Sequence, residues 1–185
     1  MNEAVLDQQG PTPLNTVLDA LVFAADWHNG QRRKDAVGSP IINHPIKVAQ
    51  LLGTCGISDT TVLSAAVLHD VVNDTDATFE MLDARFGADI TTLVRELTQA
   101  KGLKRDQRRQ ELLDASLKLS ESAALIRLAD KVCKLEDVIR SAPIGWSRQR
   151  RRDYSNWVRE VTVSLRGRNT LLDARLDETL ALAPE

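Results

Sequence analysis

Long hydrophobic runs are missing from this sequence of 185 residues. No segment approaches the ~20 consecutive apolar residues that a helix needs to cross a bilayer, so we expect no association with a membrane. Residues 1–4 are acidic, and they lack the basic and apolar stretches of a secretory signal. The sequence is therefore typical of a cytoplasmic protein.

Cysteine and net positive charge are also scarce. Cys55 and Cys133 are too few for a disulfide framework, and we expect both thiols to be reduced and mostly buried. The formal net charge is -2, and the basic runs contain no interleaved aromatic residues. The chain thus offers neither the charge nor the stacking groups that bind nucleic acid, and we expect no such partner.

Strand patterns are absent as well. No stretch alternates apolar and polar residues for long enough to predict a β-strand, whereas apolar residues recur at helical spacing along most of the chain. The length suits one domain, and 43% hydrophobic and 27% charged residues are ordinary for a globular protein. We predict an all-α fold, a single helical bundle over residues 1–185, with 1–10 and 183–185 loosely held.

Capping residues and helix breakers set the bounds of the expected helices. For example, Thr12 caps a helix with Pro13 in its first turn, and Ser58 or Asp59 caps another. We predict helices at residues 13–29, 44 to 53 or 56, 59–70, 78–86, 90–97, 120–140, 147–165 and 169–182. The charged segment 101–109 fits either a loop or the start of a further helix.

Three short segments of the sequence offer two imidazoles and two carboxylates. These candidate metal ligands are His44, His69, Asp70 and Asp130. Taken singly, each has an ordinary structural explanation; Asp130, for example, lies in an apolar run and needs a partner, which Arg127 or Lys131 could supply. The ordered set, with separations of 25 and 61 residues (44 to 69 and 69 to 130) on three predicted helices, is far more specific. It predicts a metal site.

The kinds of donor atom limit which metals can bind and which reactions they can support. Two nitrogens and two oxygens without a thiolate suit Mn, Fe, Co or Zn. Open positions on such a metal would take a water and a phosphate oxygen, and the metal would lower the pKa of that water and neutralise phosphoryl charge. The third histidine, His28, lies in the first helix, and we expect it to support the site or the fold rather than to bind the metal.

Three basic groups are candidates for contact with an anionic substrate. Arg33 and Lys34 lie on a loop directly before the first candidate ligand, and this adjacency favours contact with phosphate. The group at 148–152, which begins with Arg148, fits substrate contact and solvated surface equally well. We interpret the group at 101–109 as a solvated helix face.

Several segments beyond the His-Asp pair match a known family. They are residues 25–28, 31–35, Gly38, 40–45, 65–75, 86–87, 128–131, Pro143, 145–147, Tyr154 and Trp157. From residue 24 to about residue 169 the chain resembles the HD-domain (p)ppGpp hydrolases of the RelA/SpoT type. The likeness is strongest to their stand-alone forms, the metazoan SpoT homologues and the bacterial small alarmone hydrolases.

This resemblance implies an all-α HD domain that removes the 3′-pyrophosphate of (p)ppGpp with Mn2+ as cofactor. By position, the four candidate ligands resemble the metal ligands of the family. Arg33 and Lys34 resemble its basic pair near the nucleotide, and Tyr154 matches a tyrosine near the substrate. Asp74 matches the second acid of a Glu-Asp pair that hydrolysis requires.

Two positions beside the metal motif differ from the family pattern. Asn73 stands where the family usually has the Glu of that pair, and an amide cannot transfer a proton as a carboxylate does, although it can hold a water. Lys134 stands where Asn is usual, four residues after Asp130 and on the same helix face. Its cation fits contact with phosphate, or a solvated position with no role.

Three functions fit these residues. The first is a metal-dependent 3′-pyrophosphohydrolase of alarmone nucleotides, (p)ppGpp or (p)ppApp. The second is an HD phosphatase of another phosphorylated nucleotide such as NADPH. The third is an alarmone sensor that has lost turnover, for which Asn73 is the main support. The intact ligand set, Asp74 and the Arg33-Lys34 pair favour an enzyme. The sequence leaves open which base is bound and whether the chain forms a homo-oligomer.

Overall fold

The computed structural model describes residues 12–183, and most of these are helical. Along this part of the chain lie α1 (Pro13–Trp27), α2 (Asn43–Thr54), α3 (Thr60–Leu68), α4 (Val71–Asp74), α5 (Phe79–Phe86), α6 (Ala88–Leu97), α7 (Arg105–Ser116), α8 (Glu121–Ser141), α9 (Arg148–Thr162), the 3-10 turn η1 (Val163–Leu165) and α10 (Thr170–Ala181). Within residues 12–183 the β-type pairing is limited to an isolated bridge between Arg32 and Pro40. The predicted all-α fold is confirmed.

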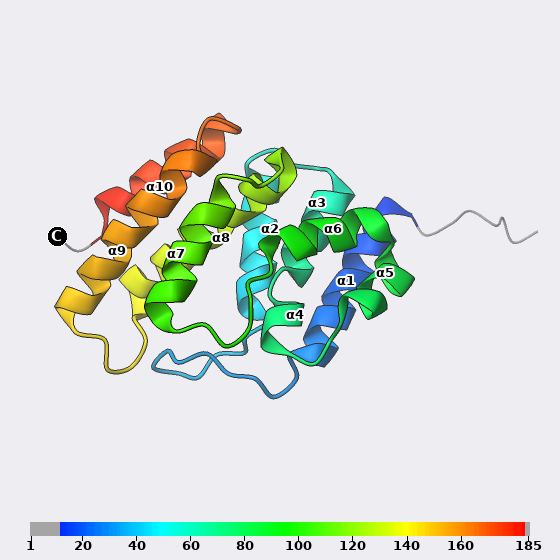
Figure 1. The fold of residues 1–185 in the computed structure, drawn as a ribbon, viewed down its shortest axis with the longest axis horizontal. Coiled ribbons are helices and arrows are strands. Elements are labelled where there is room, and N and C mark those ends of the chain that lie inside the picture. The colour runs from blue at the N-terminus through cyan, green and yellow to red at the C-terminus, as the bar shows by residue number, and fades with distance from the viewer. Residues whose placement is uncertain (1–11, 184–185) are drawn as a thin grey trace, which may run out of the picture.

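The longest helix, α8, passes through the middle of the molecule. It contacts α2, α3 and α6 on one side and α9 and α10 on the other (Figure 1). Twelve of its 21 residues are buried, and they point in every direction around the helix, which is typical of a central helix rather than a surface one. Asp130 and Lys131 are charged and nevertheless belong to this buried set.

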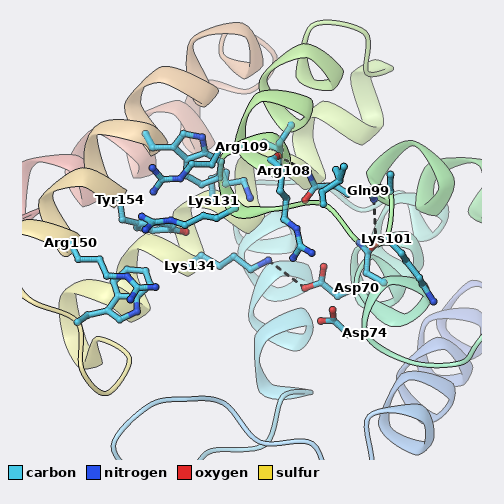
Figure 2. A pocket seen from close by; sticks show the side chains of 17 residues that line it. Asp70, Asp74, Gln99, Lys101, Arg108, Arg109, Lys131, Lys134, Arg150 and Tyr154 are labelled. Atoms are coloured by element: carbon cyan, nitrogen blue, oxygen red, sulfur yellow. Dashed lines mark hydrogen bonds and ion pairs between the residues drawn. The ribbon is translucent and has the colours of Figure 1, made fainter.

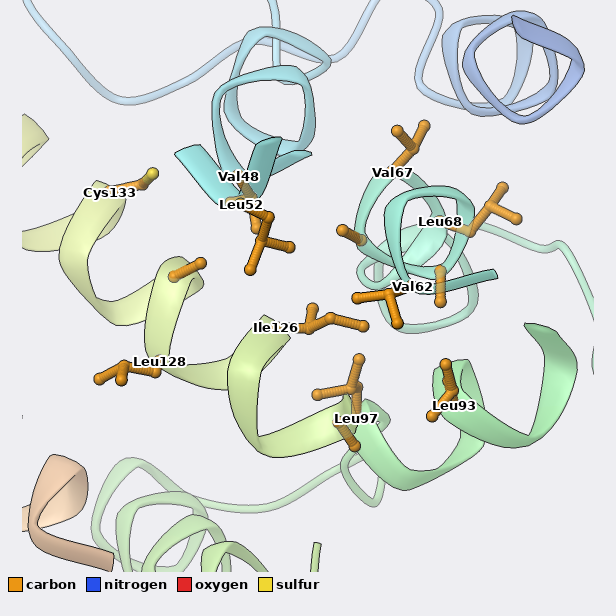
Figure 3. Close-up of a cluster of buried hydrophobic side chains, with 14 of the residues drawn as sticks. Val48, Leu52, Val62, Val67, Leu68, Leu93, Leu97, Ile126, Leu128 and Cys133 are labelled. Carbon is orange, nitrogen blue, oxygen red and sulfur yellow. The ribbon is translucent and has the colours of Figure 1, made fainter. Parts of the chain in front are cut away.

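A close-packed apolar core lies between the helices that carry the candidate ligands. Leu52 of α2, Val62 of α3, Leu97 of α6 and Ile126 of α8 meet there, and each is at most 4% exposed (Figure 3). Burying one such side chain stabilises the fold by ~1.5–3 kcal/mol, and close packing resists relative movement of the helices. The core therefore fixes α2, α3 and α8 relative to one another.

The expected helix starts are in place. At six of them the side-chain oxygen of the capping residue accepts a hydrogen bond from a backbone amide in the first turn of the helix. The capping residues are Thr12, Asp59, Thr78, Ser120, Ser147 and Asn169. Asp59 rather than Ser58 caps α3. Gly87, with φ of 81°, separates α5 from α6 in a backbone conformation that favours glycine.

One predicted helix is interrupted at the candidate site. His69 and Asp70, predicted at the end of a helix, follow directly after it, because α3 ends at Leu68 and α4 begins at Val71. The Nδ1 atom of His69 donates to the carbonyl of Ala66 at 2.7 Å. In a continuous helix that carbonyl would accept from the amide of residue 70. The histidine side chain takes the place of a backbone bond, and the chain turns there.

The charged segment 101–109 divides between a loop and the first turn of α7, which starts at Arg105. The ends expected to be loose lie outside the described residues, except Ala183, which is buried and donates its amide to the carbonyl of Leu180. None of the helices within residues 12–183 combines the length and the apolar character needed to cross a membrane.

The substitution Leu68→Ala tests whether the core beneath the ligands carries the stability of the fold. Leu68 is fully buried, so we expect the free energy of unfolding to fall by about 2–5 kcal/mol through lost burial and a residual cavity. Urea denaturation followed by circular dichroism measures this. The control is Leu117→Ala, at a side chain that is 73% exposed, which should change stability by less than about 0.5 kcal/mol. Equal losses in both variants would contradict the assignment.

Candidate functional site

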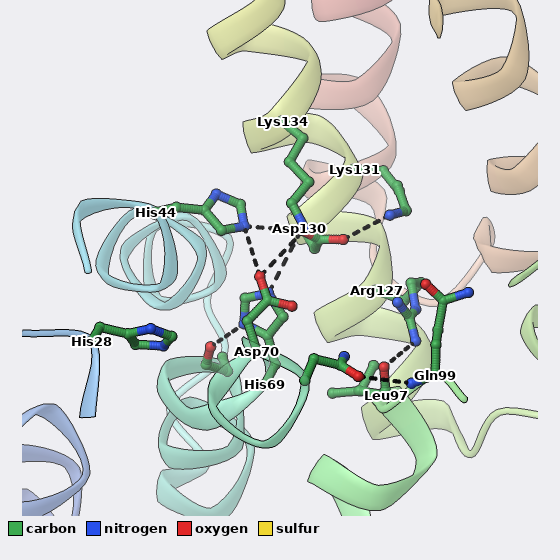
Figure 4. A network of polar contacts seen from close by, with 12 residues as sticks. His28, His44, His69, Asp70, Leu97, Gln99, Arg127, Asp130, Lys131 and Lys134 are labelled. Atoms are coloured by element: carbon green, nitrogen blue, oxygen red, sulfur yellow. Dashed lines mark hydrogen bonds and ion pairs between the residues drawn. The ribbon is translucent and has the colours of Figure 1, made fainter. Parts of the chain in front are cut away.

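Four side chains from separate parts of the chain converge next to α8. His44 lies in the first turn of α2, His69 and Asp70 form the break between α3 and α4, and Asp130 lies in the middle of α8 (Figure 4). One nitrogen or oxygen from each lies within 4.8 Å of the others. The structure thus brings together all four residues that the sequence predicted as metal ligands.

Two carboxylate oxygens face both imidazole rings. The Nε2 atom of His44 lies 2.9 Å from Oδ1 of Asp130 and 3.9 Å from Oδ2 of Asp70. The Nε2 atom of His69 lies 3.1 Å from Oδ2 of Asp70 and 3.6 Å from Oδ1 of Asp130. Both rings are almost completely buried. The four atoms therefore surround one common point, away from bulk water.

The hydrogen bonding of His69 fits a metal at that point. Because Nδ1 donates to the Ala66 carbonyl, the neutral ring presents a lone pair at Nε2, which is buried and has no hydrogen-bond partner among residues 12–183. That lone pair faces carboxylate oxygens, an arrangement that needs a cation or a proton between them. Burial alone lowers the pKa of His69, but the two carboxylates outweigh it and raise the pKa to about 9. A divalent metal would satisfy the same atoms.

Asp130 is held in place by two lysines. Lys131 donates to its Oδ2 atom at 2.9 Å, and Lys134 lies 2.9 Å from its Oδ1 atom. Burial alone would raise the pKa of the Asp130 carboxyl, but these cations hold it well below its usual range. The sequence allowed either Arg127 or Lys131 as the partner of Asp130, and the structure shows Lys131 in that position. Arg127 instead donates to the carbonyl of Leu97 at 2.7 Å.

Lys134 contacts the candidate ligands. The sequence had left open whether this lysine takes part in the site or is only solvated. Its ammonium also lies 3.4 Å from Oδ2 of Asp70, so it contacts both carboxylates (Figure 4). Burial disfavours the charged lysine, but Asp130 and Asp70 outweigh burial and raise the pKa of Lys134 above its usual value. Lys134 is therefore a fixed positive charge beside the candidate ligands.

A large cavity of about 730 Å³ opens beside Asp70 (Figure 2). Its lining includes seven cationic side chains and only two anionic ones. The cationic residues are Lys101, Arg105, Arg108, Arg109, Lys131, Lys134 and Arg150, and the anionic ones are Asp70 and Asp74. A ligand with several negative charges suits this lining.

The segment 101–109 supplies four of those seven cations, so the interpretation of this segment as a solvated helix face missed a part of the site. The sequence did contain a signal: Arg105, Arg108, Arg109 and Leu112 have the spacing of one helix face, and all four line the cavity. What the sequence did not show is that this face turns toward the ligands rather than toward open solvent.

Asp74 lies in the same cavity, four residues after Asp70. Burial, followed by the charge of Asp70, raises the pKa of Asp74. Its backbone carbonyl accepts from Nε2 of Gln31 at 2.8 Å, and the oxygen of Gln31 lies 2.9 Å from Nδ1 of His28. Because the Gln31 amide nitrogen is the donor, its oxygen accepts, and Nδ1 of His28 carries the hydrogen. His28 thus lies outside the ligand set and supports the backbone at Asp74.

Asn73 also faces the cavity. Its side-chain oxygen accepts from the backbone amide of Gln99 at 3.2 Å, which joins α4 to the loop before α7. The amide group of Asn73 carries no charge and therefore adds no negative potential to the cavity.

A smaller cavity of about 170 Å³ lies on the other side of Lys134. Arg33 and Lys34 line it, and Arg33 is fixed by Asp137 at 2.6 Å. Tyr154 lines both cavities. Its ring packs between Trp146 and Trp157, with ring centroids 5.5 and 5.6 Å away, and burial raises the pKa of its hydroxyl.

Arg148, which the sequence grouped with the substrate contacts, is exposed at the start of α9 and lines neither cavity. Arg150, two residues later, takes the position in the larger cavity, and its guanidinium stacks over the ring of Trp146 at 4.6 Å.

Comparison with known proteins places this arrangement in a family. The family model for the HD domain matches residues 20–169. The chain is 44% identical to guanosine-3′,5′-bis(diphosphate) 3′-pyrophosphohydrolase MESH1 of Xenopus tropicalis, over 87% of this chain and 90% of that protein. It is 43% identical to the human protein of that name, over 86% and 90%.

Solved structures agree. A metazoan orthologue of SpoT that hydrolyses ppGpp superposes with a TM-score of 0.86 at 42% identity, and the match covers 90% of this chain and 94% of that one. The protein lmo0812 of Listeria monocytogenes superposes with a TM-score of 0.61 at 23% identity, which shows a shared fold alone. The extent of these matches and the convergence of the two histidines and two aspartates lead to one conclusion: the chain belongs to the HD domain family.

Proposed function

We propose that this protein is a metal-dependent hydrolase that removes the 3′-pyrophosphate from guanosine 3′,5′-bis(diphosphate) or a closely related alarmone. Relatives that are 42–44% identical over most of both chains carry the name of this activity. The observation that carries the proposal is the position of the buried ligand cluster, which opens directly into the cavity of seven cations. Metal and phosphates would meet where Asp70 lines the cavity.

The ligand cluster supplies the first part of the mechanism. His44, His69, Asp70 and Asp130 would hold a divalent cation, which we propose is Mn2+. Such a cation supplies a water of lowered pKa and neutralises charge on the phosphoryl group. Lys131 keeps Oδ2 of Asp130 occupied, so that Oδ1 faces the imidazoles.

Asp74 supplies the second part. As general base it would take a proton from the attacking water while the bond between phosphorus and the 3′ oxygen breaks, and it would then return that proton to the departing 3′ oxygen. The products would be pyrophosphate and a nucleoside 5′-diphosphate with a free 3′ hydroxyl. The raised pKa of Asp74 brings it closer to neutral pH, where a general base is most effective. Asn73, next to it, would hold the water by hydrogen bonding. Gln31 fixes the backbone at this point.

Each of the two cavities would bind a different part of the nucleotide. Cations of the larger cavity, such as Arg108, would bind phosphate groups through charge-assisted hydrogen bonds. The smaller cavity, with Arg33, Lys34 and Tyr154, would take the nucleoside. The ring of Tyr154 belongs to both and would mark the boundary between them.

A panel assay tests the proposal directly. The purified protein with Mn2+ is incubated with ppGpp, pppGpp, ppApp, pppApp and NADPH, and the products are resolved. Release of pyrophosphate from at least one alarmone is expected. A second function, alarmone sensing without turnover, is favoured by Asn73 alone. Inactivity on every nucleotide of the panel, with the metal bound, would favour that alternative over hydrolysis.

The metal site is tested by His69→Ala. We expect this variant to lose Mn2+ affinity by more than the ~10–100-fold that follows the loss of a supporting residue, because a ligand itself is removed. Metal content after gel filtration and titration calorimetry measure the loss. The matched control is His28→Asn, which changes a buried histidine outside the ligand set and should retain the metal. Unchanged metal content in His69→Ala would refute this ligand assignment.

The role of Asp74 as general base is tested by Asp74→Asn. We expect turnover to fall by ~10²–10⁴-fold while Mn2+ content stays unchanged. A base acts in its ionised form, so turnover of the native protein should decrease as pH falls through the pKa of Asp74, which burial raises above the usual aspartate value. A pH-rate profile should show this acidic limb in the native protein and not in the variant. Near-normal turnover in the variant would exclude Asp74 as the base.

The role of Asn73 is tested by Asn73→Glu. If a missing carboxylate limits the chemistry, this variant should have a raised kcat and a KM close to that of the native protein, since the carboxylate acts in the transition state. The control, Asn73→Gln, lengthens the side chain without adding charge and should give no gain. A lower kcat with a higher KM in Asn73→Glu would show instead that the cavity requires an uncharged group here.

A further inference from the structure

Lys134 holds the two oxygens that a metal would need. Its ammonium lies 2.9 Å from Oδ1 of Asp130 and 3.4 Å from Oδ2 of Asp70. These are the same two oxygens that face Nε2 of His44 and of His69. An oxygen that coordinates a divalent cation lies close to two positive charges, and an ammonium on the same oxygen is repelled by that cation. Metal and ammonium therefore compete for these atoms.

Lys131 does not compete in this way. It contacts Asp130 through Oδ2, the oxygen directed away from the imidazoles, and it is almost completely buried. Lys134 differs because its side chain is 34% exposed and lines both the larger and the smaller cavity. A lysine has a flexible four-carbon stem and carries a point charge, so its ammonium can move while its backbone stays in α8.

The larger of the two cavities that Lys134 can enter is suited to an anion, because it contains six further cations. The smaller one has a mixed lining, with Arg33 and Lys34 beside Asp35 and Asp137. If the ammonium moved away from Asp70 and Asp130 into the larger cavity, Asp74 would be the remaining carboxylate among the lining residues described. A phosphate group of the substrate would be its natural partner.

We propose that Lys134 is an internal cation that competes with the metal for Asp70 and Asp130 and, once displaced by the metal, binds a phosphate of the substrate. The proposal rests on the metal site of the proposed function. Metal binding would make an additional phosphate ligand available, and phosphate binding would in turn favour the displaced lysine and hence the metal. Such coupling is reciprocal by thermodynamic linkage.

The first experiment measures metal affinity without substrate. The full-length, metal-stripped protein is titrated with Mn2+ at one pH by calorimetry, and Lys134→Gln and Lys134→Met are compared with the native protein. Both variants should bind Mn2+ about tenfold more tightly or better, because the competing charge is gone. The control is Lys101→Gln, which removes a positive charge from the same cavity without any contact to Asp70 or Asp130, and should change the affinity much less. Thermal unfolding confirms that each variant is folded.

The second experiment measures the coupling. Inorganic phosphate is titrated into each protein with and without Mn2+, and the quantity compared is the gain in phosphate affinity on adding the metal. The native protein and Lys101→Gln should show the same gain. In Lys134→Gln the increase in phosphate affinity on adding Mn2+ should be smaller by about tenfold, because this variant has no ammonium that the metal can displace toward the phosphate.

The outcomes separate this proposal from the proposed function. Tighter Mn2+ binding together with a reduced gain in Lys134→Gln supports the competing cation. Unchanged or weaker Mn2+ binding in both Lys134 variants, with a native protein that does bind Mn2+, overturns it and leaves the metal site intact. An unchanged gain overturns the role in phosphate binding. Failure of the native protein and of every variant to bind Mn2+ overturns the metal site and this proposal together.

Discussion

The burial of Asp130 in the middle of α8 is the constraint on which the rest of the structure depends. A carboxylate that is 1% exposed costs several kcal/mol unless its charge is balanced and its lone pairs are bonded. Three elements answer this requirement: α2 contributes His44, the break after α3 contributes His69, and α8 itself contributes Lys131 and Lys134. The apolar core between these elements keeps the partners in register, so that stability and ligand geometry arise from the same packing.

The two carboxylates of the site are already neutralised by lysines before any metal is counted. Asp70 and Asp130 contribute two negative charges, and Lys131 and Lys134 contribute two positive charges, each within 3.4 Å of a carboxylate oxygen. A bound divalent cation would therefore add uncompensated positive charge at the mouth of a cavity that is already cationic. Phosphate groups would provide the compensation, so the charge of this site suits an anionic ligand better than a neutral one.

The sequence predicted the helix starts because capping is a local signal, and it predicted that four distant side chains converge because their order and spacing follow a family pattern. A capping residue such as Asp59 satisfies amides two and three residues away, and the order of His44, His69, Asp70 and Asp130 carries the family pattern. The break after Leu68 was not predictable, because it depends on a side-chain hydrogen bond from His69 to a backbone carbonyl. The cationic wall of 101–109 was missed for another reason, since a charged face looks the same whether it borders a cavity or open solvent.

Asn73 and Lys134 are best understood together, as two changes that alter charge in the same direction. An acidic side chain at position 73 would place a third carboxylate near Asp70 and Asp74 and would raise the pKa of Asp74 further. The amide avoids this, and its bond to Gln99 fixes the loop that carries the cations into the cavity. Lys134 adds a positive charge to the same region. Both residues make the potential at the ligands more positive, which weakens attraction for a metal and strengthens it for phosphate. These two residues beside the ligands, rather than the ligand set itself, thus set the balance between metal and anion binding.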